Sequence, residues 1–476
     1  MLSGVRSRGE KCGVFAIYTR QGEVAKLTYF ALYALQHRGQ ESAGIAVSDG
    51  KDIMLMKDMG LVSQVFSEGD LSSLTGHLAV GHVRYSTTGS PFWENAQPIE
   101  VPWRRGSLVV AHNGNLINTE ELRAELEGKG MRFRSTSDTE VIAMLLAQSE
   151  APDIEEAVRE VAPRLVGAYS LAIMTRDRII GLRDPNGVRP LCVGSFQDGY
   201  AVSSESCGLD IIGASYIREI EPGEMAVIDG DGLRFQQAVE KREPSLCIFE
   251  FIYFARPDSF LYGTNLYHAR KNMGMALAEE APADADIVMP IPDTGIPAAI
   301  GFSQASGIPF GEGLIKNRYV GRTFIQPTQD IRRLGVRLKL NPLTRDIQGK
   351  RLVVVDDSIV RGNTTREIIQ MLKASGAREI HLRISSPPDK FPCFYGIDTA
   401  VQSELIASSK SVEEIRDFLG VDSLHYLSFE NLVRSTGRKR EEFCLACFDG
   451  DYPIPIPEGL GLSKCRLETG NGVRSR

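Results

Sequence analysis

Apolar residues fall into short runs along the first half of the chain, separated by polar residues and glycines. Runs of this kind are typical of strands, and we expect strands over 12–18, 43–47, 78–85, 108–112, 169–174, 178–182, 200–203 and 224–228. Helical spacing predicts helices over 27–35 and 137–148 and a third after Asn118, where Glu121 completes the spacing of a capping box. Strands clustered with helices between them predict a layered fold with a largely antiparallel sheet.

The pattern changes around residues 234–244, where Gln, Lys, Arg and Glu replace the apolar positions. Beyond this seam, residues 287–291 and 351–355 form apolar runs, each followed by a polar, Gly-bearing loop and then by helical spacing. Parallel strands in an α/β sheet give this pattern. We therefore expect one domain over residues 12–235 and a second over residues 236–476.

Composition narrows the class of protein. The chain has 476 residues, of which 42% are hydrophobic and 24% charged, as in ordinary globular proteins. Its net charge of -7 argues against a nucleic-acid partner. No apolar run approaches the roughly 20 residues of a membrane helix, and neither end shows a secretory or lipidation signal. We expect a cytoplasmic protein with no membrane partner, in which eight cysteines favour metal binding or catalysis over disulfides.

The clearest candidate site follows the apolar run at 351–355. This strand delivers Asp356 and Asp357 to its carboxyl end, where ligands of open α/β sheets bind. Gly362 lets the backbone approach closely, and a helix expected to begin near Thr365 points free N–H groups at the loop. Paired carboxylates beside a phosphate suggest ribose hydroxyls or Mg²⁺ as further ligands. A solvated acidic turn with a Thr N-cap is the simpler alternative, and the combined features favour the phosphate site.

This segment resembles the type I phosphoribosyltransferases. The resemblance implies that Asp356 and Asp357 contact the ribose of phosphoribosyl diphosphate and Mg²⁺. It also implies that a loop holds the 5′-phosphate, through Gly362, Asn363, Thr364 and Thr365. A second loop at 292–295 matches the family's pyrophosphate loop and implies roles for three residues, Asp293, Thr294 and Gly295, with Thr294 also at the Mg²⁺.

Between the two loops, residues 316–339 are strongly basic. They contain Lys316, Arg318, Arg322, Arg332, Arg333, Arg337 and Lys339 against a lone Asp330. A mobile lid over a polyphosphate has this character, and so has a solvated loop. The position between two phosphate loops favours the lid.

A second candidate site surrounds Cys12 at the start of the first strand. A lone cysteine is usually a small buried hydrophobe, but three strand or helix ends supply companions: Arg84 with hydroxyls, Asn113 with Gly114, and Asp138. Glutamine hydrolysis needs these groups. It needs a thiolate and a base that removes the thiol proton. The α-amine of a terminal Cys, with a pKa near 7.7–8.0, can be that base. Hydrolysis also needs oxyanion donors and one cation and one anion for the amino-acid end of glutamine.

Residues 12–230 resemble the class II, N-terminal-nucleophile glutamine amidotransferases, with further matches at 37–41 and 184–189. The resemblance implies that loss of a propeptide, residues 1–11, frees Cys12 as the nucleophile. It implies an oxyanion hole from the Asn113 side chain and the Gly114 N–H, and glutamine binding by Arg84, Thr87 and Asp138.

Together the two halves resemble the amidophosphoribosyltransferase family. The implied fold is an αββα N-terminal-nucleophile glutaminase domain followed by an α/β phosphoribosyltransferase domain with a parallel sheet. The implied reaction converts glutamine, phosphoribosyl diphosphate and water into phosphoribosylamine, glutamate and pyrophosphate, the first committed step of purine synthesis, with ammonia passed between the sites. A homotetramer and feedback inhibition by purine nucleotides are further family expectations.

Two alternatives remain, one within the same class of amidotransferases and one from another class of protein. Another class II amidotransferase, such as a sugar-phosphate aminating enzyme or an asparagine synthetase, would lack the segment with Asp356 and Asp357. A regulatory protein that binds phosphoribosyl diphosphate or nucleotides without catalysis would need no Cys12 and none of its partners.

Four further cysteines, Cys247, Cys393, Cys444 and Cys447, could hold zinc or a [4Fe–4S] cluster, and their spacing does not choose between them. Unrelated buried thiols are the plain alternative. Resemblance to the propeptide-bearing, iron–sulfur branch of the family favours a structural [4Fe–4S] cluster. Cys192, Cys207 and Cys465 remain unassigned, as packing or surface residues.

Overall fold

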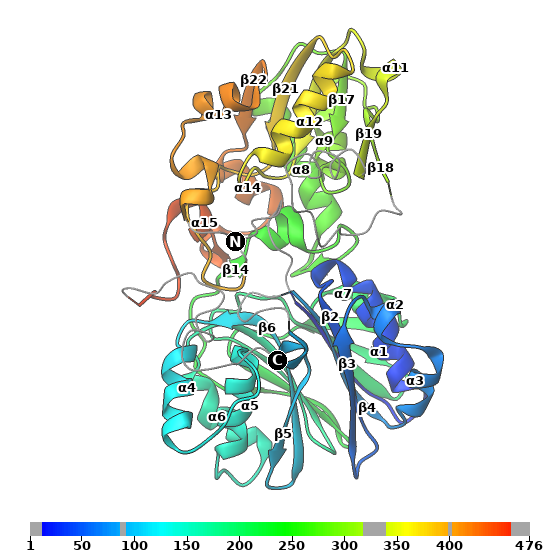
Figure 1. Cartoon of the computed structure of the whole chain (residues 1–476), viewed down its shortest axis with the longest axis vertical. Coiled ribbons are helices and arrows are strands. Elements are labelled where there is room, and N and C mark those ends of the chain that lie inside the picture. The colour runs from blue at the N-terminus through cyan, green and yellow to red at the C-terminus, as the bar shows by residue number, and fades with distance from the viewer. Residues whose placement is uncertain (1–11, 86–91, 318–338, 398–401, 458–476) are drawn as a thin grey trace.

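The computed structural model describes residues 12–85, 92–317, 339–397 and 402–457, which form two lobes (Figure 1). The first half of the chain builds the lower lobe of the figure and the second half builds the upper lobe. Among the described residues, no helix is long and apolar enough to cross a membrane.

Two antiparallel sheets form the first lobe. The larger has the strand order β11-β9-β10-β1-β4-β2-β3 and the smaller β13-β12-β8-β7-β6-β5. The larger sheet contains β1 Gly13–Tyr18, β2 Ser42–Ser48, β3 Ile53–Met59, β4 Leu78–Arg84, β9 Cys192–Phe196, β10 Gly199–Ser203 and β11 Ser215–Glu219. The smaller contains β5 Ile99–Trp103, β6 Gly106–Leu116, β7 Gly167–Met174, β8 Ile179–Arg183, β12 Glu224–Asp229 and β13 Gly232–Gln237.

The two sheets pack face to face and helices cover their outer faces. Along β1, Val14 and Ala16 enter the core between the sheets, while Phe15 and Ile17 face the outer helices, as the two-residue period of a strand requires. The larger sheet is covered by α1 Val24–Ala34, α2 Val62–Val65, α3 Glu68–Ser73 and α7 Ser206–Asp210. The smaller is covered by α4 Thr119–Gly128, α5 Asp138–Gln148 and α6 Ile154–Val161. This arrangement confirms the predicted αββα sandwich.

The second lobe contains a parallel sheet in the order β17-β20-β21-β22. Its strands are β17 Ile287–Pro290, β20 Arg351–Asp356, β21 Glu379–Ile384 and β22 Ser423–Tyr426. One face packs against α12 Asn363–Ala374 and α13 Val412–Leu419, and the other against α8 Leu266–Glu280, α9 Ile296–Ser306 and α14 Phe429–Thr436. Val353 and Val355 face one side and Leu352 and Val354 the other. The sheet is therefore buried on both faces, which explains its continuous apolar runs.

Shorter elements complete the second lobe. They are β14 Leu246–Cys247 with β23 Phe443–Cys444, β15 Phe260–Leu261 with β16 Thr264–Asn265, β18 Leu314–Lys316 with β19 Leu340–Pro342, and the helices α11 Thr344–Ile347 and α15 Ala446–Asp449.

Among the differences from the sequence predictions, three concern a helix cap, a helix start and the domain boundary. Asn118 precedes α4 but makes no side-chain cap; its amide instead bonds the backbone of Arg164 and Val166, so the predicted capping box is wrong. Helix α12 begins at Asn363, two residues before Thr365. Strand β13 extends to Gln237 and contains the proposed domain boundary between residues 235 and 236. It lies at the edge of its sheet, where polar residues are tolerated and the apolar signal is weak.

Helices α8 and α9 cross at a pair of glycines. A Cβ on Gly274 would lie 1.8 Å from the carbonyl oxygen of Ala298, and one on Gly301 would lie 1.9 Å from that of Lys271. The helices therefore touch backbone to backbone, which only glycine permits. Since α9 begins at Ile296, directly after the loop at 292–295, this crossing also sets the position of that loop.

We predict that Gly301→Ala destabilises the second lobe. Forcing the helices apart should cost about 1–3 kcal/mol, against which alanine's better helix propensity returns up to about 1 kcal/mol. The measurement is the midpoint of denaturant unfolding followed by circular dichroism. Gly128→Ala in α4 is the matched control, because no atom lies within 4 Å of its added Cβ. Equal midpoints for the two variants would contradict the close-packing argument.

Candidate active site

Cys12 lies at the start of β1, against the end of its neighbour β4. Its side chain is buried, and Sγ donates a hydrogen bond of 3.4 Å to the carbonyl oxygen of Tyr85. Burial raises the pKa of the Cys12 thiol to about 11, and the bond to Tyr85 only partly opposes this shift. The thiol is therefore neutral near pH 7 and needs a base before it can act as a nucleophile.

A buried cation and a buried anion flank the thiol. Arg84, the last residue of β4, forms an ion pair with Glu41. Asp138 begins α5 and accepts a hydrogen bond of 3.1 Å from the N–H of Leu116. Arg84 lowers and Asp138 raises the pKa of Cys12, so both charges act on the same thiol. The structure thus brings together the two charges that a glutamine zwitterion requires.

Asp138 is held in its charged form. Burial alone would raise the pKa of its carboxyl, but His112 and the N–H of Leu116 outweigh burial and hold the pKa below its ordinary value. The His112 Nδ1 atom lies 3.5 Å from the carboxylate. An ionised carboxylate at this position suits an ammonium group.

Strand β6 carries Asn113 and Gly114 at its buried end. Among the described residues, the Nδ2 atom of Asn113 is buried without a hydrogen-bond partner. An unsatisfied buried donor costs about 1–3 kcal/mol, so a site that retains one is suited to an acceptor that arrives with a ligand. A Cβ on Gly114 would lie 2.0 Å from the carbonyl oxygen of Ala168, and its φ is +156°. Only glycine fits there.

Sequence reasoning missed the group behind Cys12. Arg38, in the short 3₁₀ turn η1 Gln36–Arg38, donates a hydrogen bond of 3.0 Å from Nε to the carbonyl oxygen of Cys12. Its other N–H groups bind Glu205 and Glu250, and all three side chains are fully buried. The match at 37–41 marked Arg38 only as part of a motif, and nothing in the sequence linked it to Glu250.

The other family match, at 184–189, builds a loop. The Asp184 carboxylate accepts hydrogen bonds of 2.9 Å from the N–H of Asn186 and 3.0 Å from that of Val188. Burial raises the pKa of Asp184 to about 6, against the opposing effect of Arg183. The segment therefore organises the backbone that carries Arg189 toward the second lobe, where it binds the carbonyl oxygen of Tyr395.

The paired carboxylates lie where the sequence predicted, at the carboxyl end of β20. The N–H of Asp357 donates to Asp356 Oδ1 at 2.9 Å, while Ser358 Oγ and Thr294 Oγ1 both donate to Asp357. Burial raises the pKa of Asp356 well above its ordinary value, and the charge of Asp357 adds to the shift. Hydroxyl donors or a cation would relieve this repulsion.

The loop after β17 lies beside these carboxylates. Thr294 reaches Asp357, and the exposed Asp293 forms an ion pair with Lys316 in β18. A Cβ on Gly295 would lie 2.6 Å from the carbonyl oxygen of Val355. This contact holds the loop tightly against β20, so the residues at 293–295 share one edge of the sheet with Asp356 and Asp357.

The loop after β20 ends in a helix N-terminus. Gly362 has φ +74° and precedes α12, so three residues form the first helical turn: Asn363, Thr364 and Thr365. Their N–H groups cannot bond within the helix, and together with the helix dipole they form an anion-binding site. The earlier start of α12 places all three residues at the helix N-terminus, which fits a phosphate better than a helix that begins at Thr365.

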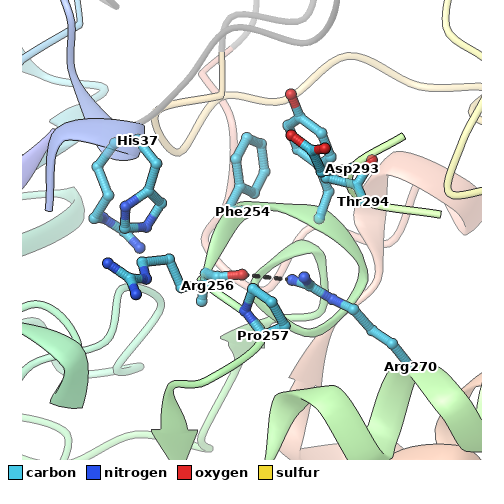
Figure 2. A pocket seen from close by; sticks show the side chains of 10 residues that line it. His37, Phe254, Arg256, Pro257, Arg270, Asp293 and Thr294 are labelled. Carbon is cyan, nitrogen blue, oxygen red and sulfur yellow. Dashed lines mark hydrogen bonds between the residues drawn. The ribbon is translucent and has the colours of Figure 1, made fainter. Parts of the chain in front are cut away.

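A cavity of about 270 Å³ lies between the two sites. His37 and Arg38 line it from the first lobe and Asp293 and Thr294 from the second, with Arg270 of α8 also in its wall. Figure 2 shows His37 on one side, Asp293 and Thr294 on the other and the Phe254 ring between them. Residues beside Cys12 and the loop at 292–295 thus face one shared space.

The remaining cysteines gather in the core of the second lobe. Cys247 and Cys444 are paired in register on β14 and β23. Burial raises the pKa of both Cys393 and Cys444, and Cys247 adds to both shifts. Cys447 follows in α15 within the same apolar cluster. In this arrangement, the described residues contain no group of three or more His, Cys, Asp or Glu side chains placed to hold a metal ion. Separately, Cys192 and Cys207 pack in the core beneath α1.

Several predicted residues lie outside the described ranges. They are Thr87, the proposed propeptide 1–11, Cys465, and Arg318, Arg322, Asp330, Arg332, Arg333 and Arg337 of the proposed lid. The ends of that lid are described, because Lys316 in β18 and Leu340 in β19 are antiparallel partners.

Comparison with known proteins identifies a family for each half of the chain. A glutamine amidotransferase domain family matches residues 82–210, and a phosphoribosyl transferase domain family matches residues 265–385. A relative from Synechococcus elongatus named amidophosphoribosyltransferase is 55% identical over 466 residues, covering 97% of this chain and 94% of the relative. One of the same name from Bacillus subtilis is 49% identical over 461 residues, covering 96% and 97%.

Two solved structures share the whole fold. One, described as the allosteric regulatory enzyme of purine biosynthesis, has a TM-score of 0.91 at 48% identity, with 95% of this chain and 98% of that chain covered. The other, the glutamine phosphoribosylpyrophosphate amidotransferase of B. subtilis complexed with ADP and GMP, has a TM-score of 0.90 at 48% identity and covers 95% and 99%. The chain therefore belongs to the amidophosphoribosyltransferase family.

Proposed function

We propose that Cys12 hydrolyses glutamine and that the ammonia reacts in the second lobe with phosphoribosyl diphosphate. Glutamine and water give glutamate and ammonia; ammonia and phosphoribosyl diphosphate give phosphoribosylamine and pyrophosphate. The sum is the amidophosphoribosyltransferase reaction, the first step of purine biosynthesis. The observation that carries the residue assignment is the 270 Å³ cavity, which is lined by Arg38 behind Cys12 and by Asp293 and Thr294 of the diphosphate loop.

The glutaminase half follows from the surroundings of Cys12. With residues 1–11 removed, the new α-amine takes the thiol proton, which burial otherwise holds with a pKa of about 11. The thiolate attacks the side-chain amide of glutamine, and Asn113 Nδ2 with the Gly114 N–H stabilises the oxyanion. Arg84 and Asp138 hold the α-carboxylate and α-ammonium, with Thr87 beside them. Ammonia leaves, and water then releases glutamate from the thioester.

The phosphoribosyl half rests on the edge of the parallel sheet. We assign the ribose hydroxyls to Asp356 and Asp357, and the 5′-phosphate to the first turn of α12. We assign binding of the pyrophosphate to residues 293–295. Asp356, Asp357 and Thr294 would hold Mg²⁺, which when bound neutralises charge on the leaving pyrophosphate. The repulsion between the two carboxylates and their hydroxyl donors support this assignment.

Other family features enter as proposals. We assign two domains that meet near the end of β13, a propeptide ending at residue 11, a basic lid over residues 316–339, a cytoplasmic location and a homotetramer. Feedback inhibition by purine nucleotides is supported by the B. subtilis structure complexed with ADP and GMP. We also propose a structural [4Fe–4S] cluster on Cys247, Cys393, Cys444 and Cys447, with zinc as the lesser alternative; their gathering in one apolar cluster supports it.

We predict that Cys12→Ala separates the two nitrogen sources. Glutamine-dependent activity should fall more than about 10³-fold because the nucleophile is lost, while ammonia-dependent activity stays within about twofold because the second lobe is untouched. Product formation is measured with each source. Cys192→Ala, which removes a buried thiol from β9, is the control. Loss of both activities would show that Cys12 is misassigned. Intact mass spectrometry of active protein should show a chain that begins at Cys12.

The double variant Asp356→Asn, Asp357→Asn should lose activity with both nitrogen sources. Removing both charges should lower phosphoribosylamine formation at least about 10²-fold from either nitrogen source, because substrate and Mg²⁺ lose their ligands. Asp346→Asn, on an exposed position of α11 in the same lobe, should leave both rates unchanged. Undiminished ammonia-dependent rates in the double variant would refute the placement of the phosphoribosyl site.

Metal analysis tests the cysteine cluster. Protein purified without oxygen should contain about four iron and four sulfide per chain. Cys444→Ser should lose the iron, whereas Cys207→Ser, in the core of the first lobe, should retain it. One zinc and no iron in the unmodified protein would exclude the iron–sulfur proposal.

A further inference from the structure

The carbonyl group of Cys12 is held by a cation that the second lobe neutralises. Arg38 donates Nε to that carbonyl at 3.0 Å, and its two terminal nitrogens reach Glu250 at 3.0 and 3.1 Å. Both side chains of this pair are fully buried. A two-point contact between guanidinium and carboxylate fixes the plane as well as the position of the arginine.

The second carboxylate on Arg38 is anchored elsewhere as well. Glu205 accepts from His37 at 2.7 Å, from the Ser259 hydroxyl at 2.7 Å and from the Arg256 N–H at 2.9 Å. Glu205 meets Arg38 at one nitrogen, whereas Glu250 meets it with both carboxylate oxygens and also lies 3.8 Å from Arg189. Glu250 is therefore the carboxylate whose two-point contact sets the orientation of Arg38.

Glu250 begins the π-helical turn η4 Glu250–Phe254, and this turn is itself clamped. Arg270 of α8 donates to the carbonyl oxygens of Phe251 at 2.8 Å, Ala255 at 2.6 Å and Glu250 at 3.3 Å. Arg270 also lines the cavity opposite His37 (Figure 2). Glu250 therefore reaches Arg38 from a backbone segment that Arg270 of the same lobe holds in place.

We infer that Glu250 is a positioning residue of the glutaminase site, supplied by the second lobe. By orienting Arg38 it holds the peptide plane of Cys12, and with it the directions of the α-amine and the Sγ atom. The inference rests on the proposed role of Cys12 as nucleophile. It predicts that the glutaminase site is complete only when the phosphoribosyl lobe is docked and Glu250 keeps its charge.

The test is Glu250→Gln in the full-length processed enzyme. An amide accepts at one oxygen and turns an N–H group toward the second guanidinium nitrogen, so the two-point contact is lost. The kcat for glutamine hydrolysis should fall about tenfold or more, since small misplacements of reacting groups cost that much. The KM for glutamine should change less than about threefold, because Arg84 and Asp138 still bind the substrate. Ammonia-dependent synthesis should stay within about twofold.

Two further variants keep the inference falsifiable. Glu250→Asp retains the charge but withdraws it by one methylene, so its kcat should lie between those of wild type and Glu250→Gln, again with ammonia-dependent synthesis unchanged. It serves alone if Glu250→Gln does not fold. Tyr262→Phe is the matched control, because it removes a bond between the lobes, from Arg183, that does not involve Arg38; its glutaminase kcat should be that of wild type.

The outcomes separate this inference from the proposed function. Wild-type glutaminase kcat in both Glu250 variants overturns the positioning role, and so does an equal loss of glutamine- and ammonia-dependent activity. A loss in Tyr262→Phe as large as in Glu250→Gln also overturns it, because general docking would then explain both. A Cys12→Ala enzyme that still hydrolyses glutamine refutes the proposed function itself, whatever Glu250 does.

Discussion

A guanidinium buried at the junction of two lobes must be matched by carboxylates, because an unpaired charge in the interior costs several kcal/mol. Arg38 meets this requirement with Glu205 from its own lobe and Glu250 from the other, and all three side chains are fully buried. Neither lobe can move away without leaving charge uncompensated. The backbone of Cys12 is therefore held by an ion cluster that both lobes complete.

The same junction explains why the sites face each other. Cys12 begins β1 on the side of the sandwich where Asn113 and Asp138 also lie, and the parallel sheet presents Asp356 and Asp357 at its carboxyl edge. The loops at these two edges meet around one cavity. If the two proposed reactions took place on separate proteins, ammonia released by one would have to cross bulk water to reach the other. In this chain, Asp293 and Thr294 of the second lobe line the same cavity as His37 and Arg38 of the first.

Much of this was predictable from sequence because it is local. Strands β1, β4, β6, β17 and β20 follow from apolar runs, and Asp356, Asp357 and Gly362 follow from one contiguous segment. The misses have physical causes. Edge strand β13 carries alternating polar residues, and Asn118 bonds the loop at Arg164 rather than its own helix. Arg38 and Glu250 are separated by 212 positions, and no periodicity in the chain reports a contact that only the packing of two lobes creates.

For its proposed role, Cys12 consequently needs both a base for its thiol and a fixed backbone orientation. Burial raises the pKa of its thiol to about 11, so near pH 7 the thiol needs a base beside it to act as a nucleophile. In the proposed mechanism, cleavage after residue 11 creates that base as the α-amine of the same residue. The amine can take the Sγ proton only if the Cys12 backbone is correctly turned, and its carbonyl is held by Arg38. On this proposal, the reactivity of one residue depends on a covalent event at its N-terminal side, and its rate depends on an ion pair with a distant lobe.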